Sequence, residues 1–511
     1  MLNRTPIILT SSLDTNRGGV TKAVLTRANA LAELHEEVVI ITMLYQQYFT
    51  KKINQLKKRK ELSRNVKVLN FFHEMRSNEK KKKQNFKQAK YQIQEKGLTA
   101  FPDDRLADGR AFRYYTNGLY IKYKRFNKKG ELEFIDYMSR GRQRECREEY
   151  DNDGLLIRSR EMDLSYNKPS LDRYFDARGN CFMSVWVNPE NSKEQRTLTF
   201  GDTAAEYDNL YDLQTVWLNQ LLAAYKHPTV MVERREFDEM LMNVTHDNIK
   251  KIAVVHFNHL GEPFTNIKKV KKRFHRLFQK AGYFDRLVFL TEQQKQDVQK
   301  IYNNANNISV IPHSSEQIND IKNESDKNET YRPHLAITVA RLHRDKQLDQ
   351  AIRAFKDVVS AIPDAQYHIY GVGEEKENLM TLINELDLSK HVYLMGYTNN
   401  VRDAYHGAAC SILTSRQEGF GMVITESMAV GTPVISYHTK YGPGDLIEDG
   451  INSFIVPMGD VQKMADRIIQ IMHDTNLRKK MSDNALNTAG KYNEERFKRE
   501  WEEVINEQAN E

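Results

Sequence analysis

The sequence predicts an α/β protein with two doubly wound parallel sheets and an antiparallel, β-rich domain inserted into the first of them. Apolar strand-like runs alternate with helical periodicity near both ends of the chain, a pattern typical of parallel sheets covered by helices. A middle segment breaks this alternation and repeats a turn motif. The 511 residues also exceed the roughly 250–300 that one hydrophobic core holds, so several domains are expected.

The first domain opens with a β-α-β pattern. Residues 6–13 predict a strand, Gly18-Gly19 a tight turn, residues 20–34 a helix and residues 38–42 a second strand. The pattern resumes with a helix at 210–225 and strands at 228–232, 251–256, 287–290 and 308–311. We therefore expect a discontinuous first domain that comprises residues 1–75 and 206–312.

Residues 76–205 form the inserted segment. An aromatic residue, Asp or Asn, two variable residues and Gly recur at 126–130, 150–154 and 175–179, at spacings of 24 and 25. Strand-like alternation flanks each copy, so the repeat predicts an antiparallel meander with Gly at a positive-φ turn position. Asp151-Asn-Asp153 also fits a metal-binding D-x-D pattern, but the other copies have Asn-Lys-Lys and Asp-Ala-Arg there. Turn chemistry therefore explains this triplet.

The second domain is expected at residues 313–490, after a linker near 312–315. Strands at 335–340, 366–370, 392–394, 409–414 and 433–436 alternate with helices at 347–360 and 375–386. This alternation predicts a second doubly wound sheet. An amphipathic helix at 493–506 follows, within a C-terminal segment that we place at 491–511.

Composition indicates the cellular setting. No stretch approaches the roughly 18 consecutive apolar residues that a membrane span needs, and the N-terminal apolar run is too short for a signal peptide. The three cysteines, Cys146, Cys181 and Cys410, share no metal-ligand spacing and fit a reducing compartment. We therefore expect a cytoplasmic protein without a transmembrane segment.

The net charge is only +7, but the basic residues are clustered. The clusters lie at 51–60, 80–90 and 268–280. Basic clusters attract anionic polymers, nucleic acids and anionic membranes, so peripheral membrane contact is one expectation. Neither an aromatic-interleaved strand nor a DNA-reading helix accompanies them, which argues against nucleic acid. The third cluster follows His256 closely, which favours a place near a binding site.

Two glutamates mark the first candidate site. Glu418 and Glu426 lie eight positions apart, just after the apolar run 409–414. Gly419 and Gly421 allow a close approach of the backbone to a ligand, and the helix expected from Met422 offers free N–H groups to phosphate. Helical spacing would place Glu426 on nearly the same face as Glu418, within reach of one ligand. On a surface helix two such carboxylates would often be merely solvated, so the pair gains weight only from its context.

Two cations follow the strand at 335–340. Arg341 can grip a phosphate in a fork, and Lys346 adds a point charge. Surface cations are common, but ligands bind at strand tips in open α/β sheets. Together the two residues could offset the charge of a leaving diphosphate without a metal.

With these residues in place, the chain resembles the retaining GT-B glycosyltransferases of the glycogen-synthase-like superfamily over roughly residues 1–75 and 205–500. The family's motifs occur here in the family's order: Arg17-Gly18-Gly19-Val20, His256, Arg341 with Lys346, and Glu418 with Glu426. A narrower likeness rests on 256–259, 396–398, 440–443 and the β-rich insertion. In these features the chain is similar to bacterial wall teichoic acid α-glycosyltransferases and to relatives that glycosylate serine-aspartate repeats.

The resemblance implies two Rossmann-like domains that face a cleft, an acceptor domain first and a nucleotide-sugar domain second, with the C-terminal helix crossing back to the first. It implies that the insertion at 76–205 is an oligomerisation hub, with a trimer favoured. It also implies a catalytic set of His256, Arg341, Lys346 and Glu418. The implied donor-binding set is Gly18, Gly19, Arg341, Lys346, Gly419, Phe420, Gly421, Met422 and Glu426.

We therefore expect a retaining hexosyltransferase that moves glucose or N-acetylglucosamine from a UDP-sugar onto polyol-phosphate wall teichoic acid in α linkage. No metal or other cofactor is expected. Two alternatives stay open at this point: a protein O-glycosyltransferase for serine-aspartate repeats, and a non-catalytic scaffold that binds nucleotide sugar. The sequence does not decide whether His256 or His259 lies on the catalytic side, and it assigns no role to residues 441–445.

Overall fold

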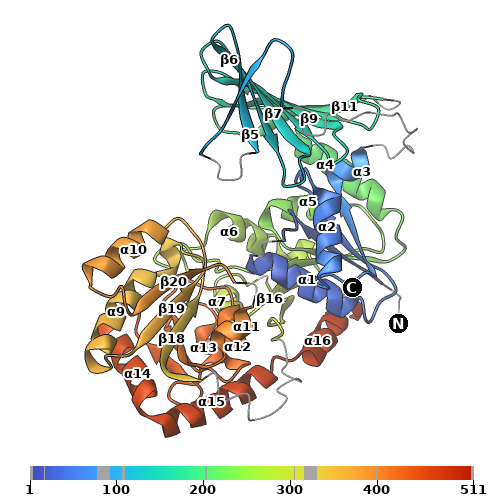
Figure 1. Cartoon of the computed structure of the whole chain (residues 1–511). Coiled ribbons are helices and arrows are strands. Elements are labelled where there is room, and N and C mark those ends of the chain that lie inside the picture. Colours follow the sequence, from blue (N-terminus) through green and yellow to red (C-terminus); the bar gives the residue numbers. More distant parts are fainter. Residues whose placement is uncertain are drawn as a thin grey trace.

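The computed structural model describes residues 4–15, 18–76, 93–105, 110–201, 204–303, 305–315, 331–398 and 400–507, and these residues form three sheets. Two sheets are parallel and covered by helices, and the third is antiparallel (Figure 1). The predicted fold class is therefore confirmed. In the described ranges, no helix is long and apolar enough to cross a membrane.

The first parallel sheet has the strand order β17-β16-β15-β14-β1-β2-β3, so it contains strands from both sides of the insertion. The strands are β1 (Thr5–Thr10), β2 (Val38–Thr42), β3 (Val66–Asn70), β14 (Pro228–Val232), β15 (Lys250–Val254), β16 (Arg286–Phe289) and β17 (Ile308–Val310). Their near-continuous Val, Ile and Leu runs match a sheet that is buried on both faces. The covering helices include α1 (Gly19–Leu31), α2 (Phe49–Lys58), α3 (Phe71–Met75), α4 (Leu210–Leu222), α5 (Asp238–Met242), α6 (Lys272–Gln279) and α7 (Glu292–Gln299).

The second parallel sheet has the order β20-β19-β18-β21-β22-β23. Its strands are β18 (Arg332–Val339), β19 (Gln366–Tyr370), β20 (Val392–Gly396), β21 (Ala408–Leu413), β22 (Val434–Tyr437) and β23 (Phe454–Val456). Its helices are α9 (Leu348–Ala361), α10 (Lys376–Glu385), α11 (Val401–Tyr405), α12 (Met422–Met428), α13 (Pro443–Leu446), α14 (Val461–His473) and α15 (Thr475–Gly490).

The last helix, α16 (Glu494–Asn506), leaves the second sheet and packs on α1 (Figure 1). Its buried side chains Phe497 and Trp501 lie in one apolar cluster with Ile8 of β1 and Val24 of α1. The side chain of Asn493 caps its first turn. The end of the chain therefore contributes to the core of the first domain.

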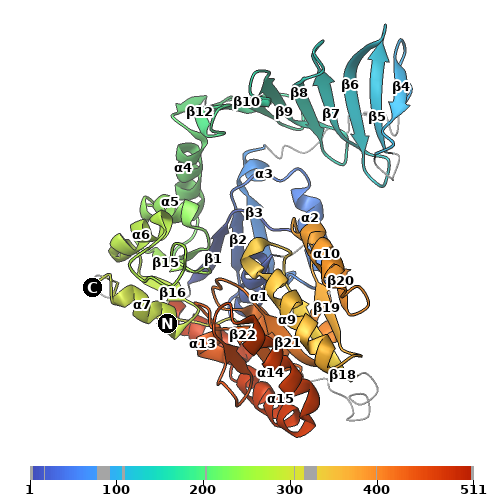
Figure 2. The ribbon, with the colours of Figure 1, turned by 90° about the vertical axis from the view of Figure 1, so that its left-hand side faces the viewer.

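Among the described residues, the inserted sheet contains ten antiparallel strands that pair in chain order, as the repeat predicted. They are β4 (Thr99–Pro102), β5 (Ala111–Thr116), β6 (Leu119–Phe126), β7 (Leu132–Met138), β8 (Arg144–Tyr150), β9 (Leu156–Asp163), β10 (Lys168–Phe175), β11 (Cys181–Val187), β12 (Glu194–Thr199) and β13 (Ala205–Tyr207). The sheet projects from the first domain, with β12 next to α4 and β4 at the far end (Figure 2).

The repeated motif forms three equivalent turns of this sheet. Gly130, Gly154 and Gly179 have φ angles of 77°, 75° and 86°, which side chains disfavour. In the second turn, Asp151 Oδ1 accepts hydrogen bonds from the backbone N–H of Asp153 at 2.9 Å and of Leu155 at 3.0 Å. Its other oxygen pairs with Arg76 at 3.3 Å. Turn chemistry therefore accounts for the Asp151-Asn-Asp153 triplet.

Replacing Asp151 with alanine should lower the free energy of unfolding by about 1–2 kcal/mol, because two backbone N–H groups lose their acceptor. The sugar transfer expected from the sequence should be unchanged in the purified variant, with or without added Mn²⁺. Denaturant unfolding measures the first effect, with Lys129→Ala, an exposed substitution in the first turn, as the matched control. Loss of a Mn²⁺-dependent activity at unchanged stability would contradict the turn role.

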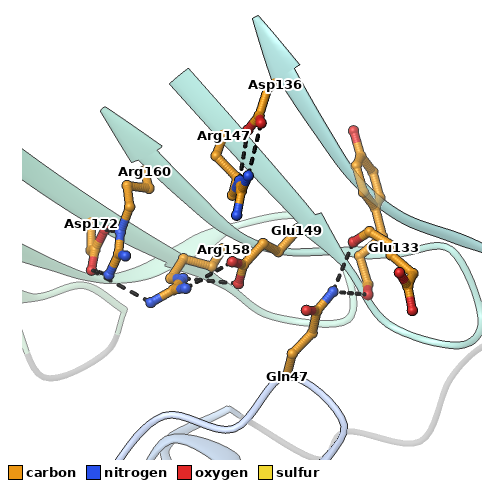
Figure 3. A network of polar contacts seen from close by, with 9 residues as sticks. Gln47, Glu133, Asp136, Arg147, Glu149, Arg158, Arg160 and Asp172 are labelled. Atoms are coloured by element: carbon orange, nitrogen blue, oxygen red, sulfur yellow. Dashed lines mark hydrogen bonds and ion pairs between the residues drawn. The ribbon is translucent and has the colours of Figure 1, made fainter. Parts of the chain in front are cut away.

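Part-buried hydrogen bonds of Gln47 join the inserted sheet to the first domain (Figure 3). Gln47, in the loop after β2, donates from Nε2 to the carbonyls of Glu133 at 2.7 Å and Tyr150 at 3.0 Å. Arg158 binds Glu149 with two hydrogen bonds of 3.0 and 2.8 Å, and its guanidinium lies 4.0 Å from the centre of the Tyr45 ring. Tyr174, Met183 and Val185 of the sheet lie in the apolar core of the first domain. The sheet and this domain are thus one packed unit.

Candidate functional site

The candidate residues gather where the strand order of each parallel sheet reverses. In the second sheet this point lies between β18 and β21, whose following loops carry Arg341 with Lys346 and Glu418. In the first sheet it lies between β1 and β14, which lead to Gly18-Gly19 and to Glu233. Ligands of doubly wound proteins bind at such points. In both sheets, the candidate residues therefore lie at the point where this rule predicts ligand binding.

Lys346 and Glu418 are in direct contact. The Lys346 ammonium lies 2.5 Å from Glu418 Oε1, and both side chains are mostly buried. The hydroxyl of Thr414 fixes the first loop by donating to the Lys346 carbonyl at 2.7 Å. Arg341 is exposed, and no described carboxylate pairs with it. Arg341 is therefore a cation available to an anionic ligand, whereas Lys346 is already paired with Glu418.

Two glycines that were not predicted as site residues from the sequence shape the Arg341 loop. A Cβ at Gly371 would lie 1.8 Å from the carbonyl oxygen of Ala340, and one at Gly373 would lie 2.1 Å from that of Leu342. Side chains at these positions would displace the loop after β18. The signal available in the sequence was only the short Gly-Val-Gly run after β19.

The loop after β21 brings the two domains into contact. A Cβ at Gly419 would lie 1.9 Å from the carbonyl oxygen of His256, which follows β15 in the first domain. Phe420 is buried, and its ring packs edge-on against His313 at 5.5 Å. Only the backbone of Phe420 is therefore available to a ligand. Glu418 and His256, far apart in the sequence, belong to adjoining loops.

The expected common helical face of the two glutamates is wrong. Helix α12 begins at Met422, because Gly421 has a φ of 83° and ends the preceding loop in the left-handed region. Glu418 therefore lies before the helix, and only Glu426 lies within it. Glu418 pairs with Lys346 of its own domain, whereas Glu426 pairs with Lys22 of the first domain.

Glu426 pairs with the first domain. Its Oε1 lies 2.7 Å from the ammonium of Lys22, in the first turn of α1. Gly18 and Gly19, at the start of that helix, are exposed, and an added Cβ at either would meet nothing within 4 Å. The two glycines therefore border open space, while Arg17 lies outside the described residues. Lys22 was not predicted from sequence, because its partner is 404 positions away.

The two histidines after β15 have different surroundings. His256 is buried, its ring stacks on His313 with centres 5.7 Å apart, and its Nε2 contacts Glu233. His259 stacks on Tyr441 at 5.6 Å and accepts from Gln294 at 3.2 Å, and burial lowers its pKa to about 3. His256 is thus the histidine beside the Glu418–Gly419 loop, whereas His259 packs within the domain contact.

Residues 441–445, whose role the sequence left open, hold the domains together. The Tyr441 N–H donates to the Glu418 carbonyl at 2.9 Å, and its hydroxyl donates to Asp297 of α7 at 3.0 Å. Asp445 accepts from the Glu292 N–H at 2.9 Å, at the start of the same helix. These bonds tie the Glu418 loop to the first domain.

The third basic cluster reaches the same contact. Lys271, just before α6, donates to Gln417 at 3.0 Å and to the Asn258 carbonyl at 2.9 Å, and burial lowers its pKa to about 8. Of the other predicted clusters, that at 51–60 is mostly on α2, and Lys80–Lys90 lies outside the described residues. The cluster at 268–280 therefore borders the site, as the sequence suggested.

This arrangement combines cations, carboxylates and glycine-lined backbone at the facing edges of two sheets. Cations can hold a diphosphate, and carboxylates can accept the hydroxyls of sugars. The described residues contain no group of three or more His, Cys, Asp or Glu side chains placed to hold a metal ion. The geometry therefore suits a ligand that carries both phosphate and sugar.

Comparisons with known proteins agree with this geometry. Residues 318–488 match the family model of glycosyl transferases group 1, and residues 7–199 match that of glycosyl transferase 1 domain A. The poly(glycerol-phosphate) alpha-glucosyltransferase of Bacillus subtilis is 26% identical over 98% of this chain and 74% of its own. The poly(ribitol-phosphate) alpha-N-acetylglucosaminyltransferase of Staphylococcus aureus is 25% identical over 98% of this chain and 99% of its own.

Solved structures share the whole fold. S. aureus TarM, in a complex with fondaparinux, alpha-GlcNAc-glycerol and UDP, has a TM-score of 0.85 at 23% identity, over 99% of this chain and 100% of its own. The pneumococcal O-GlcNAc transferase GtfA, with UDP and GlcNAc, has a TM-score of 0.73 at 19% identity over 99% of both chains. The chain is therefore a glycosyltransferase of GT-B fold that transfers a sugar from a nucleotide-sugar donor, and it is similar to the group 1 glycosyl transferases over residues 318–488.

Proposed function

We propose that this protein transfers glucose or N-acetylglucosamine from a UDP-sugar to polyol-phosphate wall teichoic acid, with retention and in α linkage. The observation that carries the proposal is the convergence of Lys346, Glu418 and Glu426 with His256 at the facing edges of the sheets. The two relatives that match almost the whole chain are named for transfer to poly(glycerol-phosphate) and poly(ribitol-phosphate), which supplies the acceptor class.

In the proposed reaction the bond between the sugar's anomeric carbon and the diphosphate breaks, and a bond to the acceptor oxygen forms on the same face. The acceptor's hydroxyl proton passes to the departing phosphate oxygen. Negative charge then grows on the diphosphate, and Arg341 and Lys346 offset it, so the proposal includes no metal. Glu418 and the backbone of residues 419–422 hold the sugar and phosphate, and Glu426 takes the ribose once Lys22 releases it.

Protein O-glycosylation is the competing proposal. It draws on relatives named as peptide N-acetylglucosaminyltransferase GtfA subunits, for example at 23% identity over 50% of this chain. The teichoic acid relatives match 98% of the chain, including the inserted sheet, and this match favours a polyol-phosphate acceptor over a protein acceptor. A scaffold without catalysis is the third possibility, and an activity assay separates all three.

The test is UDP release from UDP-glucose and from UDP-N-acetylglucosamine, each with ribitol-phosphate polymer, glycerol-phosphate polymer or a serine-aspartate repeat protein. We expect release with one donor and a polyol-phosphate polymer. Release with the repeat protein alone would move the function to protein glycosylation. No release above the donor-only rate under any condition would support the scaffold.

We also propose that the protein acts in the cytoplasm, at or near the inner face of the membrane, as a homo-oligomer. The feature that supports the homo-oligomer is an apolar hollow of about 470 Å³ on the inserted sheet, lined by Leu171, Trp186 and Phe200 among others. Phe200 is 44% exposed. A second copy of the chain could cover this face, and the resemblance favours a trimer.

Replacing Phe200 with glutamate should dissociate the assembly, since a carboxylate would then lie in the apolar hollow beneath the copy that covers it. Light scattering after size exclusion measures the mass, with Tyr283→Glu as control, because Tyr283 is also an exposed aromatic residue, at 58%, but lies in the first domain. We expect only the Phe200 variant to run as a monomer. A wild-type protein that is already monomeric would contradict the proposal.

A further inference from the structure

Glu233 is a buried carboxylate at the reversal point of the first sheet. It directly follows β14, and its N–H donates to the Leu9 carbonyl of the neighbouring β1 at 3.0 Å. Its side chain is 0% exposed. One oxygen accepts from Arg27 of α1 at 2.5 Å, and the other contacts Nε2 of His256. Both carboxylate oxygens are therefore used inside the protein.

The three ionisable groups are enclosed together. The side chains of Arg27 and His256 are each only 3% exposed, and the Arg27 guanidinium lies 4.3 Å from the centre of the Trp501 ring of α16. Burying such a set costs free energy that apolar residues of similar size would avoid. Stability alone therefore gives no reason to keep an ionised Glu233 under His256.

The contacts fix the protonation of the pair. Burial alone would raise the pKa of Glu233, but Arg27 and His256 bring it below its ordinary value, so the group is a carboxylate and only accepts. Burial also lowers the pKa of His256, although Glu233 opposes this, so the imidazole is neutral. A neutral imidazole that donates from Nε2 carries no proton on Nδ1. Among the described residues, Nδ1 of His256 has no hydrogen-bond partner.

We propose that Glu233, held by Arg27, is a positioning residue that fixes His256 in the neutral Nε2–H tautomer, so that Nδ1 accepts a hydrogen bond from a hydroxyl of the bound sugar. The proposal rests on the proposed transfer function, which puts a sugar beside the Glu418–Gly419 loop. The backbone carbonyl of His256 contacts Gly419 of that loop, and the imidazole is the side chain of the same residue. An acceptor atom there requires the sugar hydroxyl to donate its proton, whereas an N–H would require the hydroxyl to accept.

Glu233→Gln tests the idea with little change in shape. The glutamine carbonyl can still accept from Arg27, but its amide must donate to His256 Nε2, which moves the histidine proton to Nδ1. We expect transfer to fall about 100-fold, because the sugar hydroxyl loses its acceptor. The ratio of the Kd for the UDP-sugar to the Kd for UDP should rise, since UDP has no hydroxyl at that place. Glu233→Asp should restore part of the activity.

Nitrogen-15 NMR of histidine-labelled enzyme without donor reads the tautomer directly. We expect a protonated Nε2 in the wild type and a protonated Nδ1 in Glu233→Gln, with His256→Gln used to assign the signal. A wild-type His256 protonated on Nδ1 would overturn the proposal, even if the variant fails to fold. Unchanged activity in a folded Glu233→Gln variant would also overturn it. Because the tautomer is read without turnover, failure of the proposed function is distinguishable from failure of this inference.

Discussion

Replacing Arg341 with alanine should lower kcat/KM for sugar transfer by about 100- to 1,000-fold, the effect of losing a charged donor to a developing anion. The loss is expected mainly in kcat, because the charge on the diphosphate grows as its bond to the sugar breaks. Arg341 is exposed and pairs with no described carboxylate, so the fold loses no contact with it. Steady-state kinetics with the better donor measures the effect.

Arg353→Ala is the matched control, since Arg353 is also exposed but lies within α9, away from the strand tips. It should behave as the wild type. Both variants should keep the mass of the assembly, because the inserted sheet is untouched. Undiminished transfer by Arg341→Ala would overturn the assignment of this residue to the diphosphate.

Gly419→Ala should reduce transfer by more than about 100-fold, because misplacement of a reacting group by about 1 Å has effects of this size. The added Cβ would lie 1.9 Å from the His256 carbonyl, a backbone atom that cannot rotate away. The Glu418 loop or the β15 tip must then move, and the domains separate at the site. Activity should fall while each domain stays folded, as judged by circular dichroism and thermal unfolding.

Gly490→Ala is the control for this substitution. Gly490 ends α15, and a Cβ there would meet nothing within 4 Å, so activity should not change. If Gly419→Ala retained wild-type kcat and KM, the close contact between the Glu418 loop and His256 would not be required for catalysis.

Local patterns predicted much of the fold. The turn glycines at 130, 154 and 179 specify their own conformation, because a positive φ is a property of one residue and its neighbours. Strands such as β2 and β14 were predicted at their observed ends from β-branched runs alone. Periodicity and turn chemistry act over a few residues, and a sequence displays them directly.

The candidate site was predictable in its residue types but not in its pairings. Lys346 with Glu418, and Lys22 with Glu426, meet only because two sheets face each other. Glu233 carried no signal, since a glutamate after a strand is usually solvated, and its burial depends on Arg27 and His256. The expected shared helical face of Glu418 and Glu426 failed because Gly421 delays the start of α12. The pairings and burial of these residues depend on long-range contacts, which the local spacing of residues in the sequence does not reveal.

The most direct test of the proposed function is the configuration of the product. The enzyme would be incubated with UDP-glucose or UDP-N-acetylglucosamine and a purified polyol-phosphate polymer, and the new sugar's anomeric proton read by NMR. We predict a polymer-bound hexose with the small anomeric coupling of an α linkage. A β-linked product would contradict retention, and no sugar on either polymer, with transfer to a serine-aspartate protein instead, would contradict the proposed acceptor.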